Sequence, residues 1–278
     1  MITIDDIHPQ RFVEIDVMSL EDKIVNPDWV IEQKLDGVRA MAFVSNGTVE
    51  WYTGRGKRSP LKSTAVKTEQ VTAILSQLRG SWVFDGEFIR DTFHIFDMPF
   101  AENDPPEYNI GPDSPFEQRR RHLGFIYHRV LKSQYVKLVP QARTEEEKRT
   151  LVANCQAQAV EGVMLKKLDS VYNCGGFCSG ILKAKFTKTV DCVVMARNVG
   201  GKENAQLGVY DNGVLTYCGM VSMLGKGEAE IGDVLEVKYL YGTNDYILYQ
   251  PRVIKRRDDK AATDCLLNQI VRTSKAVV

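Results

Sequence analysis

The feature that most constrains this chain is a change of pattern near Val190. Before that point, segments with strand and helix patterns alternate, whereas the last stretch of about 90 residues consists of short apolar segments separated by turn residues. Such alternation predicts layers of helix and sheet, and closely spaced strands predict a small barrel or sandwich. We therefore expect an α+β protein with two domains, at residues 1–187 and 188–278, and the length of 278 residues is sufficient for two cores.

Turn residues and periodicity locate the elements of the first part. Asn46-Gly47 is a strong type I′ turn signal, which predicts a hairpin of Val38–Ser45 and Thr48–Thr53 after a strand at Trp29–Lys34. Serine or threonine followed by glutamate three residues later predicts helix starts at Ser114-Pro115 and Thr144. The remaining expectations are a helix between a Ser63/Thr64 cap and Gly80, strands at Trp82–Arg90, Phe93–Met98, Gly162–Lys167 and Ile181–Phe186, and a loop at Tyr172–Gly180.

The second part is expected to be all-β. Its strands are expected at Cys192–Ala196, Gln206–Tyr210, Val214–Ser222 and Val234–Tyr241, with a hairpin turn at Asn212-Gly213.

Composition excludes several classes of protein. No apolar run approaches the roughly 20 residues of a membrane span, and the acidic first ten residues are unlike a signal peptide, so we expect a cytoplasmic protein. Six scattered cysteines favour free thiols, and the four histidines lie far in sequence from the Cys174/Cys178 pair, which disfavours zinc. The net charge is zero, but basic stretches such as Arg55–Lys67 predict a surface able to hold phosphates.

The segment from Glu32 to Arg39 contains the strongest candidate for chemistry. Alternate residues of a strand share a face, so Glu32 and Lys34 should project together, just before a turn at Asp36-Gly37. An amine at a strand end beside a turn is a candidate nucleophile, although a solvated lysine on an edge strand gives the same pattern.

Six further segments follow in order, and the set resembles the motifs of covalent nucleotidyltransferases, the superfamily of ATP-dependent DNA ligases, RNA ligases and mRNA capping enzymes. The resemblance implies an N-terminal adenylyltransferase (ATP-grasp-like nucleotidyltransferase) domain with antiparallel sheets and flanking helices, followed by a small all-β oligonucleotide-binding (OB-fold) barrel. The segments are Thr53-Gly54-Arg55-Gly56-Lys57, Asp85-Gly86-Glu87-Phe88, Phe93-His94-Ile95-Phe96-Asp97, Glu161-Gly162-Val163-Met164, Leu182-Lys183-Ala184-Lys185 and Arg257-Asp258-Asp259-Lys260.

This resemblance implies a role for each motif residue. Lys34 would attack the α-phosphorus of ATP and hold AMP as a phosphoramide, and Lys183 and Lys185, on one strand face, would contact the phosphate. The resemblance further implies that Glu32 reads the adenine amino group, Arg39 and Arg55 contact ribose and phosphate, Phe96 stacks on the base, Glu87 and Glu161 hold Mg²⁺ (or Mn²⁺), and Arg257 and Lys260 contact the triphosphate. Glycines flank Arg55 directly, unlike the commoner Ser-Arg-x-Gly form.

The same resemblance narrows the superfamily to DNA ligases. Glu161-Gly162 is similar to the DNA ligase motif, whereas capping enzymes usually have Asp-Gly there, and many RNA ligases lack the all-β domain; these two classes remain the alternatives. With only 33 residues before Lys34, we expect ATP rather than NAD as cofactor. The expectation is a minimal ligase of the viral or phage kind, monomeric, acting on nicked duplex DNA, with a hinge near Thr187–Asp191. A non-catalytic nucleic-acid-binding protein is the alternative from another class.

Overall fold

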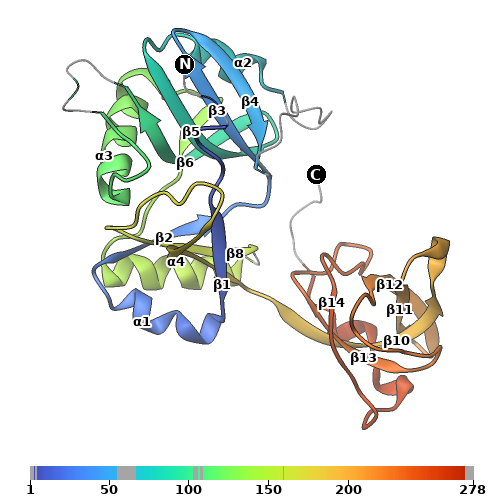
Figure 1. Cartoon of the computed structure of the whole chain (residues 1–278). Helices are drawn as coiled ribbons and strands as arrows, with labels where there is room; N and C mark the ends of the chain where they lie inside the picture. Colours follow the sequence, from blue (N-terminus) through green and yellow to red (C-terminus); the bar gives the residue numbers. More distant parts are fainter. Residues whose placement is uncertain are drawn as a thin grey trace. The chain divides into compact units, whose positions relative to one another are not determined.

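The computed structural model describes residues 3, 5–54, 67–102, 106, 109–158 and 160–272. The chain forms two compact units, residues 1–155 with 162–185 and residues 156–161 with 186–278. Figure 1 shows the helices and strands of both units.

Unit 1 contains two sheets. A four-stranded sheet has the order β1-β9-β8-β2 and a five-stranded sheet has the order β4-β3-β5-β6-β7. Their strands are β1 (Arg11–Ile15), β2 (Trp29–Lys34), β3 (Val38–Ser45), β4 (Thr48–Thr53), β5 (Ser81–Ile89), β6 (Thr92–Ala101), β7 (Val136–Leu138), β8 (Gly162–Lys167) and β9 (Phe177–Lys185). The helices are α1 (Glu21–Ile24), α2 (Glu69–Leu75), α3 (Phe116–Ile126) and α4 (Glu145–Ala157), with a 3-10 turn at Val17–Ser19 and a π-helical turn, η3, at Tyr127–Leu131.

The sheets are mixed rather than purely antiparallel as expected. β1 pairs with β9 in parallel, and β6 pairs with β7 in parallel, while the other pairs are antiparallel. Both parallel pairs join strands that are distant in sequence, and their partners β1 and β7 are short, so local periodicity gave no sign of them.

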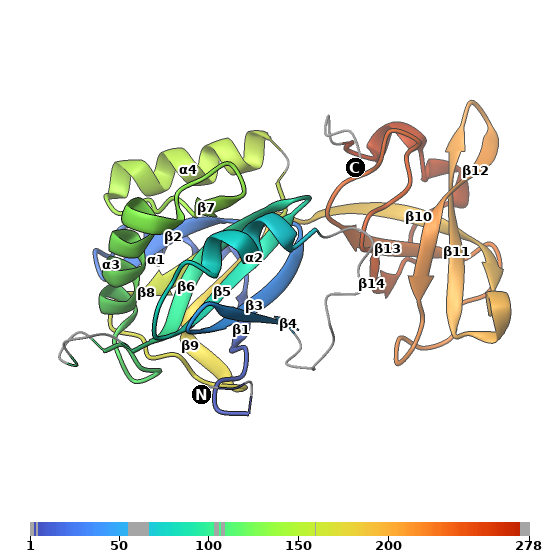
Figure 2. The ribbon, with the colours of Figure 1, turned by 90° about the horizontal axis from the view of Figure 1, so that it is seen from above.

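The five-stranded sheet is buried on both faces. Ala40, Ala42 and Val44 of β3 pack into one core with residues of α2, α3 and η3, and α2 lies across this sheet in Figure 2. The alternate residues Met41 and Phe43 pack into a second core on the other face. A strand buried on both faces reads as a continuous apolar run, which explains the composition of β3.

Two helix starts behave differently from one another. At α4 the capping box forms as expected, because Glu147 N donates to Thr144 Oγ1 at 3.2 Å and Thr144 N donates to Glu147 Oε2 at 3.0 Å. At α3 the expected serine cap is wrong: Pro115 is the N-cap residue, and Ser114 Oγ instead accepts a hydrogen bond from Gly111 N at 3.1 Å. The Ser63/Thr64 cap expected before α2 falls outside the described residues.

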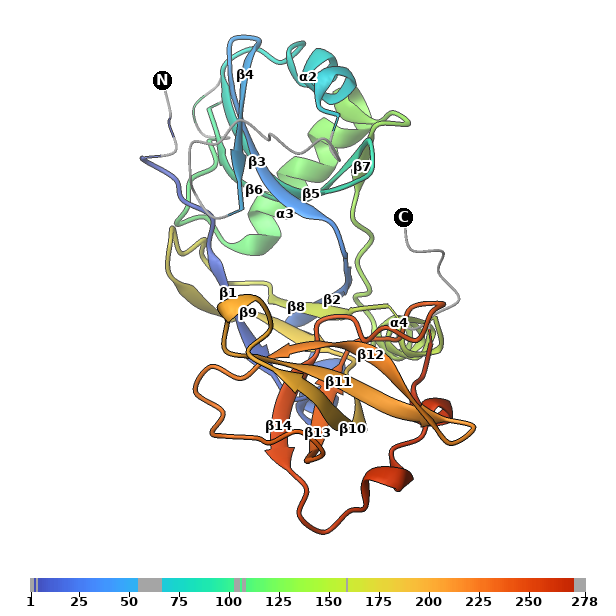
Figure 3. The same ribbon diagram turned by 90° about the vertical axis from the view of Figure 1, so that its right-hand side faces the viewer.

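Unit 2 contains one antiparallel sheet of five strands in the order β12-β11-β10-β13-β14 (Figure 3). The strands are β10 (Lys188–Arg197), β11 (Asn204–Asp211), β12 (Val214–Ser222), β13 (Val234–Tyr239) and β14 (Arg252–Arg256), with 3-10 turns at Val199–Gly201, Ala262–Asp264 and Leu267–Gln269. β14 was not expected from the sequence. All six cysteines of the chain are free thiols, as expected.

Candidate active site

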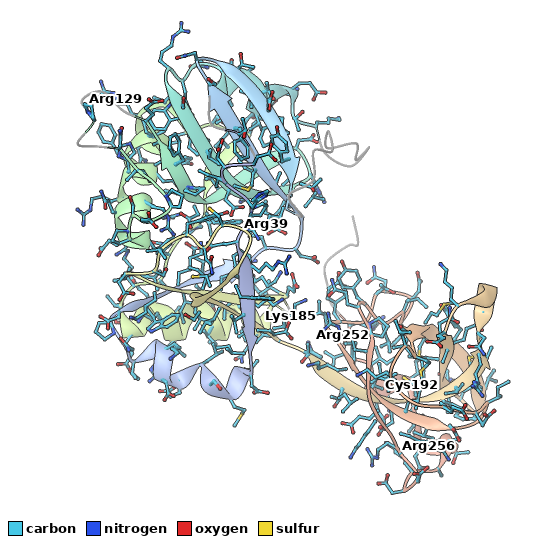
Figure 4. All side chains as sticks on the ribbon, in the orientation of Figure 1. Arg39, Arg129, Lys185, Cys192, Arg252 and Arg256 are labelled. Atoms are coloured by element: carbon cyan, nitrogen blue, oxygen red, sulfur yellow. The ribbon has the colours of Figure 1, made fainter. Side chains whose placement is uncertain are left out.

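A cavity of about 260 Å³ lies between the two sheets of unit 1. Its walls come from seven strands and two loops, which brings together residues far apart in the sequence. They are Phe12 of β1, Glu32, Gln33 and Lys34 of β2, Leu35, Arg39 of β3, Glu87 of β5, Phe96 of β6, Val139, Met164 and Lys166 of β8, and Lys183 and Lys185 of β9. Figure 4 labels Arg39 and Lys185, which reach the cavity from different sheets.

Lys34 lies at the end of β2, where Lys34 pairs with Gly162 of β8. Its Nζ donates to the carbonyl of Leu35 at 3.4 Å. A Cβ atom on Gly162 would approach the carbonyl oxygen of Ala184 to 2.0 Å, so glycine is needed for β8 to pass this close to β9. Gly162 therefore lets β8 pack closely between β2, which carries Lys34, and β9, which carries Lys183 and Lys185. As a result, lysines of both outer strands line the same cavity.

Lys183 and Lys185 both line the cavity, as their spacing of two residues on one strand requires. The parallel pairing of β1 with β9 sets Glu14 opposite Lys183, and their side chains form an ion pair of 3.4 Å. Glu14 was not singled out from the sequence.

Glu87 connects the cavity wall to the turn after Lys34. Its Oε1 accepts a hydrogen bond from Gly37 N at 2.9 Å. A Cβ atom on Gly37 would approach the carbonyl oxygen of Phe88 to 2.2 Å, so the turn needs glycine to lie this close to β5. The Asp36-Gly37 turn, which follows the strand that carries Lys34, is therefore held against Glu87 of β5.

Arg39 lines the cavity and is held in place by a buried polar network. Its guanidinium makes two hydrogen bonds to the buried Asp85, at 2.9 and 2.6 Å, and one to the carbonyl of Gln10 at 2.8 Å. Tyr172 donates to the same carboxylate at 2.7 Å, and the guanidinium lies over the ring of Phe12. Burial alone would lower the pKa of Arg39, but Asp85 more than offsets burial and raises it.

A buried ion pair of a carboxylate and an ammonium group also lines the cavity. Glu32 is 1% exposed and Lys166 is 2% exposed, and Lys166 Nζ lies 2.7 Å from Glu32 Oε2. Lys166 also lies over the ring of Phe96, which is itself 9% exposed. The sequence singled out Glu32 and Phe96, and it missed Lys166, although Lys166 is two residues beyond Met164 and so shares its strand face.

Three of the described residues singled out from the sequence, Glu161, Arg257 and Lys260, do not line this cavity. Arg55 falls outside the described residues. Glu161 belongs to unit 2, is buried, and among the described residues it is not one that lines the cavity. Arg257 and Lys260 belong to unit 2, where Lys260 Nζ lies 2.6 Å from Asp191 Oδ2 and Arg257 pairs with Asp191 and Asp259 at 3.3 and 2.8 Å.

The described residues contain no cluster of three or more His, Cys, Asp or Glu side chains that could hold a metal ion by themselves. The same part of the chain contains no helix long and apolar enough to span a membrane.

Comparison with solved structures identifies the fold. A mycobacterial DNA ligase D, solved with ATP and MES, covers 98% of this chain and all of its own (100%) with a TM-score of 0.55 and 18% identity. A Lig E DNA ligase, described as binding DNA with a minimal scaffold, covers 89% of this chain and 99% of its own with a TM-score of 0.58 and 16% identity. The chain has the DNA ligase fold.

Sequence comparison gives relatives of the same kind. A probable DNA ligase of Streptomyces coelicolor is 27% identical over 235 residues, which are 74% of this chain and 44% of that protein. A probable DNA ligase of Streptomyces avermitilis is 26% identical over 224 residues, 70% of this chain and 43% of that protein. The matches thus span less than half the length of these curated relatives. The sequence matches no protein-family model.

Proposed function

We propose that this chain is an ATP-dependent DNA ligase that seals nicks between a 5′-phosphate and a 3′-hydroxyl through a lysyl-AMP intermediate on Lys34. The observation that supports this proposal is the cavity itself, because one lysine at a strand end, three further lysines and two carboxylates from four strands line the same space of about 260 Å³. A nucleotide site needs such a mixture of phosphate-binding cations and a few directed polar groups.

In the first step, the Lys34 amine attacks the α-phosphorus of ATP, a nitrogen–phosphorus bond forms, and the bond to pyrophosphate breaks. Lys183 and Lys185 line the same cavity and would neutralise the charge of the phosphate during this step. The AMP then passes to the 5′-phosphate at the nick, and the 3′-hydroxyl attacks that activated phosphate and releases AMP.

Three side chains of the cavity wall would hold the adenine base. Phe96 and Met164 supply apolar surface for the purine, and Glu32 supplies an acceptor for its amino group. Arg39 is fixed by Asp85, so it presents a preset cation to the ribose side.

Glu87 is the carboxylate of the cavity wall that fits a divalent cation. Mg²⁺ is commonly held by one or two carboxylates together with substrate phosphates. When bound, the cation would neutralise charge on the transferring phosphate. We include Glu161 in the proposal as the second acidic residue.

We further propose that residues 1–187 form the nucleotidyltransferase domain and residues 188–278 an OB-fold domain. Arg257 and Lys260 would then orient the departing pyrophosphate. Their present partners, Asp191 and Asp259, would have to exchange for the triphosphate.

Labelling with nucleotides tests the proposal. With Mg²⁺ present, α-labelled ATP should leave a label that stays on the denatured protein and in mild base but is released by acid, as a phosphoramide requires. Lys34→Ala should abolish this label, and Lys202→Ala, which removes an exposed lysine of unit 2, should retain it. The labelled protein should then seal nicked duplex DNA, and nicks with RNA at either strand end measure tolerance. Label from GTP instead would indicate capping chemistry, and no label from ATP, GTP or NAD would refute an enzyme of this class.

A further inference from the structure

Glu32 and Lys166 form a buried ion pair in the cavity wall, and the chemistry proposed for Lys34 does not account for this pair. Lys166 extends from β8, its Nζ lies 2.7 Å from Glu32 Oε2, and it donates to the carbonyl of Phe96 at 3.1 Å. The ammonium also lies 4.7 Å from the ring centre of Phe96 and 4.9 Å from that of Phe116. Two rings and a carbonyl therefore fix the position of the ammonium.

The two oxygens of Glu32 have different surroundings. Oε1 accepts a hydrogen bond from Gln141 Nε2 at 2.8 Å, and the Arg120 guanidinium lies 3.9 Å away. Oε2 is in charge contact with Lys166 but, among the described residues, accepts no hydrogen bond of good geometry. Oε2 thus has acceptor capacity that no hydrogen bond of the described residues uses, and Glu32 belongs to the cavity wall.

The charge of the Glu32 carboxylate determines which class of purine it can bind. An ionised carboxylate only accepts hydrogen bonds, whereas a protonated one also donates. Purines with an amino group at position 6 donate there, and purines with an oxo group accept there. A carboxylate that stays ionised therefore favours the first class and repels the second.

A carboxylate as buried as Glu32 needs a counter-charge to remain ionised. Arg120 is more distant, and its own guanidinium donates to the carbonyl of Val139. Asp97, the other buried acid nearby, has a bidentate partner in Arg119. Lys166 is consequently the cation in direct contact with Glu32.

We propose that Lys166 is a positioning residue for nucleobase specificity, which holds Glu32 ionised and oriented so that the cavity selects 6-aminopurine over 6-oxopurine nucleotides. This inference rests on the proposed nucleotide site. It assigns to Lys166 a function that the motif resemblance gave to Glu32 alone.

Equilibrium binding separates this inference from the proposed activity. Calorimetry with unadenylylated protein compares ATP, ITP, which has a 6-oxo group, and purine riboside triphosphate, which has hydrogen at position 6. Wild type should prefer ATP over both. Lys166→Met should reduce the preference for ATP over ITP by about 10- to 100-fold, the effect expected from one hydrogen bond to a charged acceptor.

Two control variants sharpen the result. Lys166→Arg keeps the charge and should retain at least part of the preference. Lys167→Met removes the neighbouring lysine, which pairs with Asp169 and whose side chain is 38% exposed. This variant should leave the preference for ATP over ITP unchanged. In a Glu32→Gln background, adding Lys166→Met should alter the preference less than twofold, because Lys166 acts through the Glu32 charge; this double variant also replaces both charges of the pair, which buried sites tolerate better than one.

The outcomes are distinguishable. A folded Lys166→Met that retains the wild-type preference overturns the inference, as does a further change of preference when Lys166→Met is added to Glu32→Gln. If wild type binds ATP selectively and Lys166→Met does not, but Lys34 takes no label, the specificity inference stands and the ligase proposal fails.

Discussion

Replacing Asp97 by asparagine should destabilise unit 1 strongly. Asp97 is buried, and its carboxylate accepts hydrogen bonds from Arg119 Nε at 2.8 Å and Nη2 at 2.9 Å. Arg119 is 0% exposed, and its Nη1 also donates to the carbonyls of Ser114 and Ser170. The variant Asp97→Asn keeps the volume but leaves a buried guanidinium without its anion.

The expected loss is about 3–5 kcal/mol of unfolding free energy, because breaking one partner of a buried pair leaves an uncompensated charge. The exposed pair of Lys167 and Asp169, at 2.8 Å, provides the matched control. Its side chains are 38% and 69% exposed, so Asp169→Asn should cost about 1 kcal/mol or less.

Urea denaturation followed by tryptophan fluorescence measures this loss specifically. The chain's 3 tryptophans, Trp29, Trp51 and Trp82, all belong to unit 1, so their signal reports on that unit. With a slope of about 2 kcal/mol per molar urea, the Asp97→Asn midpoint should fall by about 2 M. A loss as small as that of Asp169→Asn would refute the claim that the pair acts as a buried charge pair.

Acidification should narrow the gap between wild type and Asp97→Asn. Burial by itself raises the pKa of Asp97, but the charge and hydrogen bonds of Arg119 outweigh burial and lower it. A carboxyl whose pKa is lowered on folding stabilises the protein above its unfolded pKa of about 3.9. That contribution is lost as pH falls below this value, so wild type should lose more stability between pH 5 and 3 than the variant.

Two further variants probe other contacts. Thr144→Ala removes the hydroxyl that caps α4 and should lower the midpoint of tryptophan-detected unfolding by an amount equivalent to about 1 kcal/mol; an unchanged midpoint would mean that the cap contributes nothing. Asp191→Asn should bring the pKa of Lys260 back down towards its ordinary value, because the hydrogen bond to Asp191 raises it. Titration of the labelled lysine by NMR measures this shift, and an unmoved pKa would contradict the contact.

Local signals predicted the hairpin well and the sheet order poorly. Asn46 and Gly47 both adopt positive φ, 46° and 87°, as the type I′ turn requires, and the flanking strands have the expected bounds. β1 has no such signal, because its parallel pairing with β9 depends on a contact between distant segments. β9 also begins at Phe177, within a stretch expected to be a loop from its glycines.

The motif residues could be named from the sequence, but their partners could not. Arg39 was expected to contact a ligand, and its principal contact is Asp85, a residue of another motif that received no role. Tyr172, which donates to the same carboxylate, comes from the stretch expected to be a loop. Such buried networks form only when several chain segments meet, so no single segment carries their pattern.

The ion-pair partner of Lys183, Glu14, could not be named from the sequence, and this partner bears on the proposed chemistry. The register of β1 on β9 gives Lys183 a carboxylate neighbour, Glu14, so a phosphate that binds Lys183 must compete with it. The contact is 3.4 Å long and the side chains are 27% and 37% exposed, and ion pairs of this kind contribute about 0–1 kcal/mol. Releasing Glu14 therefore costs little compared with the charge-assisted contacts that a phosphate makes with a lysine. Glu14 can accordingly hold Lys183 at the cavity wall without preventing the proposed phosphate contact.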